Sequence, residues 1–194
     1  NGKWGAHDEF VFAKQIDDLN REKQPFFSVL LTLSSHEPFQ VPIETPFTDR
    51  SESNKFRSAA WYSDHCLGEY FRKAKKEKWY GNTLFILVAD HGHRLPKHLN
   101  TSMPRSKHIP LLFYGEVLKK EYRGEKINLT GNQNDVATTL FRQLHLSPEG
   151  FPRSKDLLDE GALPFAYYVN SSVMGWITPS QSITYTLATK EYSV

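Results

Sequence analysis

Two short apolar runs constrain the fold of this chain more than any other feature of its sequence. Residues 26–33 read FFSVLLTL and residues 83–89 read TLFILVA. Both runs are nearly continuous and rich in residues that favour β-structure. Strands that are buried on both faces have this pattern, and such strands belong to parallel sheets that are covered by helices. The runs therefore predict two central strands of one sheet.

Helical patterns alternate with these runs. Apolar residues recur every three to four positions in residues 8–23, 51–78 and 134–144, which predicts three helices, with Asp8 and Asn134 as candidate caps. Further strands are expected at residues 109–114 and 126–129, and residues 165–169 and 183–187 are expected to form a late hairpin or edge pair. This order predicts an α/β fold, with a mostly parallel sheet flanked by helices.

The composition narrows the classes of function. A chain of 194 residues makes one domain or a large piece of one. Its net charge of +2 is too small for the concentrated basic face of a nucleic-acid-binding protein, so no nucleic acid is expected as a partner. The one cysteine, Cys66, excludes an internal disulfide and lies in a helical apolar pattern, which predicts a small core residue.

The loop after the second apolar run carries the sharpest chemical signal. Ligands bind beyond the carboxyl ends of strands in such sheets, and Asp90-His91-Gly92-His93 directly follows this run. A carboxylate beside an imidazole suits manganese, zinc or iron better than a thiolate-loving ion. Gly92 would allow a sharp turn or the close approach of a ligand. The alternative interpretation is an aspartate that caps a turn beside a surface histidine.

The loop after the first run also carries a histidine. His36 lies in the sequence SSHEP, where it could donate to an anionic ligand or act as an acid or base. The alternative is a loop histidine that makes a local hydrogen bond.

Basic side chains gather in the seventeen residues that follow the Asp90-His91 pair. Cations beside a metal suit a phosphate or sulfate ester, whose charge must be neutralised in the transition state. The alternative is a solvated basic loop. The cluster consists of Arg94, Lys97, His98, Arg105, Lys107 and His108. The sequence contains no glycine-rich phosphate loop and no serine in a G-x-S-x-G setting.

Six segments, taken in order, resemble a known family. They are WG-x-x-D at Trp4, FFSVLLTLSSHEPF, YSDHCLGEYF, TLFILVADHGH, HIPLLFYG and NDVATTLF. This order resembles the second half of the catalytic domain of the sulfatase and alkaline-phosphatase superfamily, and it is most similar to lipoteichoic-acid-synthase-like phosphoglycerol transferases. The resemblance covers most of the chain to about Asp156 and is less specific from Gly161 onward.

The resemblance implies an alkaline-phosphatase-like fold and roles for individual residues. Asp90 and His91 would bind the catalytic divalent metal, which is usually manganese in the transferases, with zinc, calcium and magnesium as alternatives. His36 would contact the phosphate or phosphoglycerol of the substrate. Lys97, His98 and His108 are candidates for further substrate contacts, and the sequence does not choose among them.

The resemblance also implies that residues 1–194 are the carboxyl-terminal part of such a domain. The family's nucleophile and remaining acidic ligands would precede Trp4, so we expect this chain to be inactive alone and to need the amino-terminal part as a partner. The substrate would be an anionic ester: a phospholipid headgroup, a glycan or a sulfated compound. The parent protein would work at the extracytoplasmic or periplasmic face of the membrane, anchored by helices outside this sequence.

Three functions remain in view. The first is the metal-dependent transfer or hydrolysis of phosphate esters by the parent protein. The second is the hydrolysis of sulfate esters by a sulfatase. The third is a non-catalytic binding domain that has kept the fold.

Overall fold

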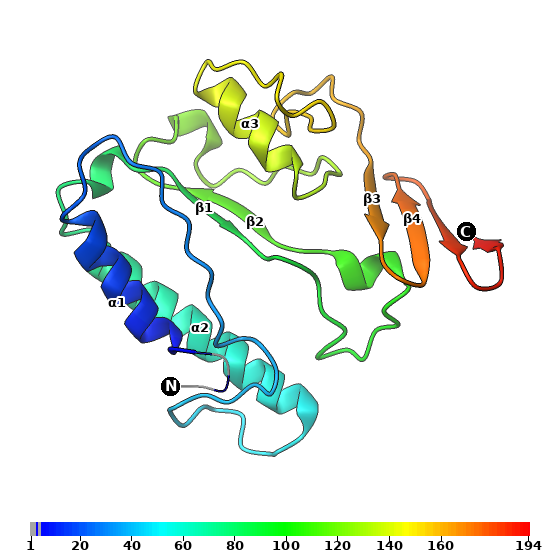
Figure 1. Ribbon diagram of the computed structural model, residues 1–194, viewed down its shortest axis with the longest axis horizontal. Coiled ribbons are helices and arrows are strands. Elements are labelled where there is room, and N and C mark those ends of the chain that lie inside the picture. The colour runs from blue at the N-terminus through cyan, green and yellow to red at the C-terminus, as the bar shows by residue number, and fades with distance from the viewer. Residues whose placement is uncertain (1–2, 4) are drawn as a thin grey trace. The chain divides into compact units, whose positions relative to one another are not determined.

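A computed structural model describes residue 3 and residues 5–194 of the chain (Figure 1). Trp4, which opens the first of the six segments, lies outside the described residues. The chain divides into two compact units. Unit 1 comprises Asn1–Phe85, Leu95–His98 and Tyr114–Val117, and unit 2 comprises Ile86–Arg94, Leu99–Phe113 and Leu118–Val194.

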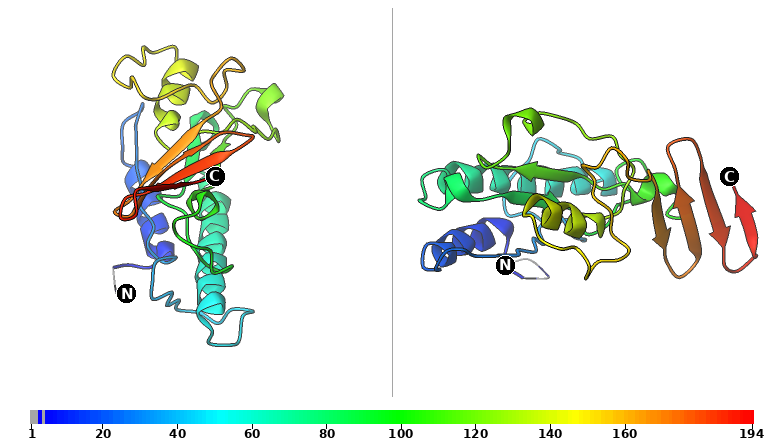
Figure 2. Two further views of the ribbon diagram at one scale, coloured as in Figure 1. Left: turned by 90° about the vertical axis from the view of Figure 1, so that its right-hand side faces the viewer. Right: turned by 90° about the horizontal axis from the view of Figure 1, so that it is seen from above.

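Unit 1 is built on two helices that lie side by side, α1 (Asp8–Leu19) and α2 (Glu52–Ala74), as Figures 1 and 2 both show. Each helix turns one apolar stripe toward the other, as expected for helices that share a core. A short 3-10 helix, Tyr80–Asn82, follows α2. The core of unit 1 consists of Phe12, Ile16, Leu19, Tyr62, Cys66, Tyr70, Ala74, Trp79 and Tyr80.

The two helices predicted for unit 1 are confirmed, but the predicted cap at Asp8 is not. Ser51 caps α2 by accepting a hydrogen bond from the backbone N–H of Asn54. Asp8 is the first residue of α1 rather than its cap, because His7 occupies the cap position. The Asp8 side chain is instead directed to the backbone of a distant loop, as described below.

The first apolar run does not form the predicted strand. Residues 26–33 lack strand structure, and the side chains of Phe27, Val29 and Leu31 are exposed. The prediction of a strand buried on both faces is therefore wrong for this run. The physical reason is that a strand needs hydrogen-bonded neighbours, and within the described chain these residues pair with none.

Unit 2 contains most of the second predicted strand. β1 (Phe85–Val88) pairs with β2 (Leu111–Tyr114), and all but the first residue of β1 and the last of β2 belong to this unit. Two short 3-10 helices, Pro104–Lys107 and Lys120–Tyr122, lie in the connections. The helix α3 (Asp135–Gln143) follows them, and its predicted cap Asn134 makes no side-chain cap bond. The strand expected at residues 126–129 is absent.

The carboxyl-terminal residues form a four-stranded antiparallel sheet in the order β3-β4-β5-β6 (Figure 2). The strands are β3 (Ala166–Val169), β4 (Val173–Ile177), β5 (Ser182–Thr186) and β6 (Glu191–Ser193). Both late segments predicted as strands are strands. They are not a hairpin, however, because β4 lies between β3 and β5.

These sheets correct the predicted architecture. The described residues form small antiparallel sheets, not the mostly parallel sheet flanked by helices that the alternation of patterns predicted. Alternating helices and apolar runs identify the elements, but they do not say which strands become neighbours. Among the described helices, none combines the length and the apolar character needed to cross a bilayer.

Candidate functional site

The loop after β1 brings the predicted metal ligands together. The Nε2 atom of His91 lies 3.7 Å from Oδ2 of Asp90, and both side chains are about two-thirds exposed, at 67% and 69%. The other carboxylate oxygen, Oδ1, accepts a hydrogen bond from the backbone N–H of His91. The loop therefore presents one carboxylate oxygen and one imidazole nitrogen side by side to solvent.

A backbone contact fixes the useful form of the His91 ring. Nδ1 of His91 lies 2.9 Å from the carbonyl oxygen of Gly92. A carbonyl can only accept, so Nδ1 must carry the proton in this contact. In neutral imidazole, Nε2 is then left with a lone pair, which is the arrangement of a metal-binding histidine.

The donor set fits part of a divalent metal site. A carboxylate oxygen and an imidazole nitrogen are suitable ligands for manganese or zinc. Two such donors, each about 2.1 Å from one ion, can be up to about 4.2 Å apart, so a separation of 3.7 Å is compatible with a shared ion. Among the described residues, no group of three or more His, Cys, Asp or Glu side chains gathers around such a point. Asp90 and His91 would thus provide two ligands of such an ion.

Gly92 is required by a close approach of two segments of unit 2. A Cβ atom at position 92 would lie 2.2 Å from the carbonyl oxygen of Ser106. Only glycine allows this contact without displacing backbone. The buried Ser106 hydroxyl in turn donates to the carbonyl of Met103 at 2.7 Å. The contact places the backbone just before His108 against the loop that carries Asp90 and His91.

The structure divides the predicted basic cluster between the two units. His108, which is exposed, belongs to unit 2 together with Asp90 and His91. Lys97 and His98 belong to unit 1, where Nε2 of His98 lies 2.9 Å from the hydroxyl of Ser53 on α2. These candidates are close together in the sequence, so their positions along the chain did not predict that they belong to different units.

Gln133 is a functional candidate that sequence reasoning missed. Its amide nitrogen Nε2 donates to the carbonyl oxygen of Ala89 at 2.7 Å and lies 3.3 Å from that of Asp90. The side chain therefore holds the backbone that orients the Asp90 carboxylate. No local pattern signals this role, because the two segments are more than 40 residues apart in the sequence.

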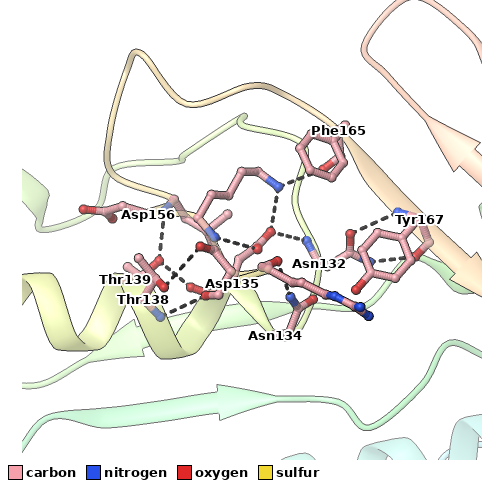
Figure 3. Close-up of polar contacts among 12 residues, drawn as sticks. Asn132, Asn134, Asp135, Thr138, Thr139, Asp156, Phe165 and Tyr167 are labelled. Carbon is pink, nitrogen blue, oxygen red and sulfur yellow. Dashed lines mark hydrogen bonds and ion pairs between the residues drawn. The ribbon is translucent and has the colours of Figure 1, made fainter. Parts of the chain in front are cut away.

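A buried ion pair fixes the start of α3, two residues after Gln133 (Figure 3). Oδ2 of Asp135 lies 2.7 Å from Nζ of Lys155, and both side chains are largely buried. The same Asp135 oxygen accepts from the backbone N–H of Asn132, and Oδ1 accepts from that of Lys155. Lys155 Nζ also donates to the carbonyl of Phe165, just before β3. The start of α3 is thus tied to two other segments of unit 2.

A second contact in Figure 3 joins the same region to β3. The side chain of Asn132 donates to the carbonyl of Tyr167 at 2.7 Å and accepts from its N–H at 3.0 Å. These two bonds occupy both backbone groups of Tyr167. Asn132 and Asp135 therefore brace Gln133 from both sides along the chain.

The loop that carries His36 is anchored by a different carboxylate. Asp8 is fully buried, and its Oδ1 accepts from the backbone N–H groups of Leu33 and Ser34 at 3.1 and 2.9 Å. Its Oδ2 accepts from the hydroxyl of Ser63 at 2.8 Å. The Ser34 hydroxyl accepts from the backbone N–H of Asp8. The loop is therefore fixed two residues before His36.

His36 borders a small hollow in unit 1 that is lined in part by basic side chains. The Nδ1 atom of His36 lies 2.9 Å from the carbonyl oxygen of Glu37, and this contact fixes the orientation of the ring. The other polar atom of the ring is Nε2. The hollow has a volume of about 20 Å³, and Lys3 and His7 also line it. Sequence reasoning missed His7, because it occupies an unspecified position of the WG-x-x-D segment just before α1. A lysine beside two histidines favours a negatively charged neighbour over a positively charged one at this position.

Cys66 is a core residue, as predicted. It is 4% exposed, and burial raises the pKa of its thiol. A buried thiol with a raised pKa is a poor nucleophile, so Cys66 does not provide the reactive group that the sequence otherwise lacks.

Comparison with known proteins gives a family match over most of the chain. A family model described as Sulfatase matches residues 1–146. The chain is 25% identical to the lipoteichoic acid synthase-like protein YvgJ of Bacillus subtilis, over 87% of this chain and 30% of that protein. It is 35% identical to the lipoteichoic acid synthase of Staphylococcus saprophyticus, over 45% of this chain and 14% of that protein. The chain thus spans less than a third of the length of these relatives.

Two solved structures resemble the chain along almost all its length. A protein of the alkaline phosphatase superfamily from Vibrio parahaemolyticus matches with a TM-score of 0.73 and 26% identity, covering 99% of this chain and 50% of that one. The lipoteichoic acid synthase LtaP of Listeria monocytogenes matches with a TM-score of 0.64 and 17% identity, covering 98% and 54%. The likeness identifies the fold as alkaline-phosphatase-like.

Proposed function

Because the chain belongs to the sulfatase family, we propose that it is the carboxyl-terminal part of a catalytic domain that transfers or hydrolyses phosphate esters with a divalent metal. Relatives named as lipoteichoic acid synthases favour phosphoglycerol transfer as the reaction. The observation that carries the proposal is the pair of exposed donors, Asp90 Oδ2 and His91 Nε2, 3.7 Å apart at the end of β1.

Each candidate residue has a separate task in this proposal. Asp90 and His91 hold the metal, with the His91 ring oriented by the carbonyl of Gly92. Bound manganese would stabilise negative charge on the nucleophile and on the phosphoryl oxygens. His36 orients the anionic ester, and the neighbouring Lys3 and His7 support this role. His108 is the further substrate contact that we favour, since the backbone before it packs against Gly92.

The remaining parts of the reaction belong to polypeptide outside this sequence. The nucleophile and the other metal ligands would come from an amino-terminal part of the same protein, and residues 1–194 would be inactive without it. The parent protein would act on a phospholipid headgroup or a glycan at the extracytoplasmic face of the membrane, where membrane helices outside this sequence would anchor it.

Sulfate-ester hydrolysis is the second candidate, favoured by the family match itself. The same donor pair and basic side chains would serve a sulfate group, because it has a similar shape and negative charge. The two functions differ in the group that is transferred, a phosphoryl or a sulfuryl group, so a direct comparison of substrates separates them.

Substitution of the donor pair tests the proposal. In the full-length protein, we expect Asp90→Ala and His91→Ala each to lower manganese affinity and turnover by at least about 100-fold, because even changes outside the ligand shell cost 10–100-fold. Metal content is measured by elemental analysis, and turnover with bis-p-nitrophenyl phosphate and p-nitrophenyl sulfate in parallel.

A histidine away from the loop provides the control. His145 is exposed and follows α3, so His145→Asn should leave metal content and turnover unchanged. Unchanged metal content and turnover in both Asp90→Ala and His91→Ala would refute the proposal. A wild-type protein that is folded but binds no metal would favour the non-catalytic binding domain instead.

A further inference from the structure

A cavity of about 230 Å³ lies between α1 and α2 of unit 1. Both helices contribute to its walls, and Ile43 completes them from the segment that connects the helices. An apolar cavity of about 150 Å³ is enough to bind benzene, so this one has room for a body of about one substituted aromatic ring. None of its lining residues belongs to the Asp90 loop or to the hollow beside His36.

The floor of the cavity is apolar. Phe12 and Ile16 of α1 and Tyr70 of α2 line it, and all three are buried. The ring centroids of Phe12 and Tyr70 lie 5.0 Å apart, and burial raises the pKa of Tyr70 to about 12. A floor of this kind favours the apolar body of a ligand, because contact with it removes apolar surface from water.

One polar atom of the cavity wall is unsatisfied. Tyr62 is 1% exposed, and its hydroxyl has no hydrogen-bond partner among the residues that the structure describes. A buried hydroxyl in this state is unfavourable, and most such groups in proteins are paired. Burial and the neighbouring thiol of Cys66 raise the pKa of Tyr62, so the hydroxyl keeps its proton and can both donate and accept. Its place in the wall indicates that a ligand supplies the missing partner.

The rim of the cavity leaves one carboxylate without a counter-charge. The titratable residues of the rim are Glu9, His65, Glu69 and Lys73. A hydrogen bond from Arg72 and the charge of Lys73 lower the pKa of Glu69, so its carboxylate is already neutralised. Within the described part of the chain, the side chain of Glu9 forms no ion pair or hydrogen bond. Its charge contributes to the raised pKa of Tyr62, so the Glu9 carboxylate lies near the unsatisfied hydroxyl.

We infer that this cavity binds a small amine whose apolar body is about the size of an aromatic ring. The body packs on Phe12 and Tyr70, and the ammonium group donates to the Glu9 carboxylate and to the hydroxyl oxygen of Tyr62. One polar group of the ligand thus provides a partner for both unsatisfied groups of the wall and rim. An anion of the same shape would be repelled by Glu9. The inference goes beyond the proposed function, since it uses no residue of the Asp90 loop.

Titration calorimetry of the full-length protein with phenethylamine tests the inference. We expect a Kd below about 1 mM, which is a weak affinity in keeping with a molecule of this size. 2-Phenylethanol has a similar body without the charge and should bind about tenfold more weakly, because hydrogen bonds to charged groups are the stronger ones. 3-Phenylpropionate, which is negatively charged, should show no binding. Asp90→Ala should bind phenethylamine with the affinity of the wild type.

Two substitutions locate the ammonium group. Glu9→Gln keeps the size of the side chain and should weaken phenethylamine binding about tenfold, while the affinity for 2-phenylethanol stays unchanged. Tyr62→Phe removes only the hydroxyl and should weaken phenethylamine binding about fivefold. Without ligand, Tyr62→Phe should be at least as stable to heat as the wild type, because the hydroxyl that it removes is unpaired. Glu22→Gln, at an exposed acid of unit 1 outside the cavity, is the matched control and should have no effect.

Four results would overturn the inference. They are the absence of phenethylamine binding, equal affinity for 3-phenylpropionate, wild-type affinity in both Glu9→Gln and Tyr62→Phe, and loss of binding in Asp90→Ala. The last would assign the amine to the Asp90 loop. If Tyr62→Phe does not fold, Glu9→Gln decides alone, because the Glu9 side chain is exposed and its replacement leaves the core unchanged.

Discussion

The two units each bury a carboxylate in the first turn of a helix, but they surround it with different partners. Asp8 of α1 is 0% exposed and accepts from two backbone N–H groups and the hydroxyl of Ser63. Asp135 of α3 is 2% exposed and lies 2.7 Å from the ammonium group of Lys155. Buried carboxylates must be hydrogen-bonded or paired with a charge. Asp8 relies on hydrogen bonds from uncharged groups alone, whereas Asp135 combines two backbone hydrogen bonds with a charged partner.

The difference teaches how each unit supports its candidate site residues. Asp8 binds the backbone of Leu33 and Ser34 directly, so it holds the His36 loop through its own hydrogen bonds. Asp135 does not contact the Asp90 loop in any of these bonds. It fixes the start of α3, from which Gln133 reaches the carbonyls of Ala89 and Asp90. One loop is anchored by the carboxylate itself and the other through an intermediate side chain.

Removal of the charged pair should have the largest effect on stability. We expect Asp135→Ala to lower the free energy of unfolding of unit 2 by about 3–5 kcal/mol, because it leaves the Lys155 ammonium buried without a counter-charge. Native-state hydrogen exchange at α3 and β3 measures this loss. The double variant Asp135→Ala/Lys155→Met removes the stranded charge and should recover part of it. Equal losses in the single and double variants would remove the contrast between the two carboxylates.

Removal of Asp8, whose hydrogen-bond partners are all uncharged, should lower the stability less. We expect Asp8→Ala to lower the free energy of unfolding of unit 1 by about 2–3 kcal/mol, since buried donors lose their acceptor but no charge is left behind. Urea denaturation followed by circular dichroism provides the value. Asp8→Asn keeps one acceptor oxygen and should lose less than Asp8→Ala. A larger loss for Asp8→Ala than for Asp135→Ala would reverse the comparison.

The intermediate side chain should affect metal binding more than stability. Gln133 is exposed, so we expect Gln133→Ala to change the free energy of unfolding by less than about 0.5 kcal/mol. In the full-length protein, its loss should weaken manganese binding by about tenfold, in the range of residues that orient metal ligands.

Asn134 offers a matched control for Gln133. It is the next residue, and its side chain also donates to a carbonyl, but that carbonyl belongs to Arg153 rather than to the Asp90 loop. Asn134→Ala should therefore leave manganese affinity, measured by titration calorimetry, unchanged. Equal effects of Asn134→Ala and Gln133→Ala on manganese affinity would show that the Gln133 bonds have no particular role.

Sequence reasoning located the helices because their signals are local. The apolar stripe of α2 lies within one stretch of chain, and the helix predicted from it is confirmed. The adjacency of Asp90 and His91 is likewise a local property, since consecutive residues after a strand cannot separate far. Their side chains are near one another, although their role as metal ligands remains a prediction.

Sheet partners and supporting residues could not be predicted in the same way. The apolar run at residues 26–33 has the composition of a central strand, but its pairing depends on neighbours that the described chain does not provide. β3 and β5 were each identified, whereas β4 between them was not. Gln133 belongs to none of the quoted segments, and His7 fills an unspecified position of one of them, so only their surroundings in the fold mark them.

The sequence by itself determined the helical stripes, the apolar runs, the Asp90-His91 pair and the family resemblance, because each depends on residues close together along the chain. The tertiary structure alone decided which carboxylate is neutralised by a lysine, which side chain holds the Asp90 loop, and which face of residues 26–31 is left bare. These are contacts between segments that are 13 to 44 residues apart. Burial and pairing between such distant segments depend on how the chain packs, so local sequence patterns do not predict them.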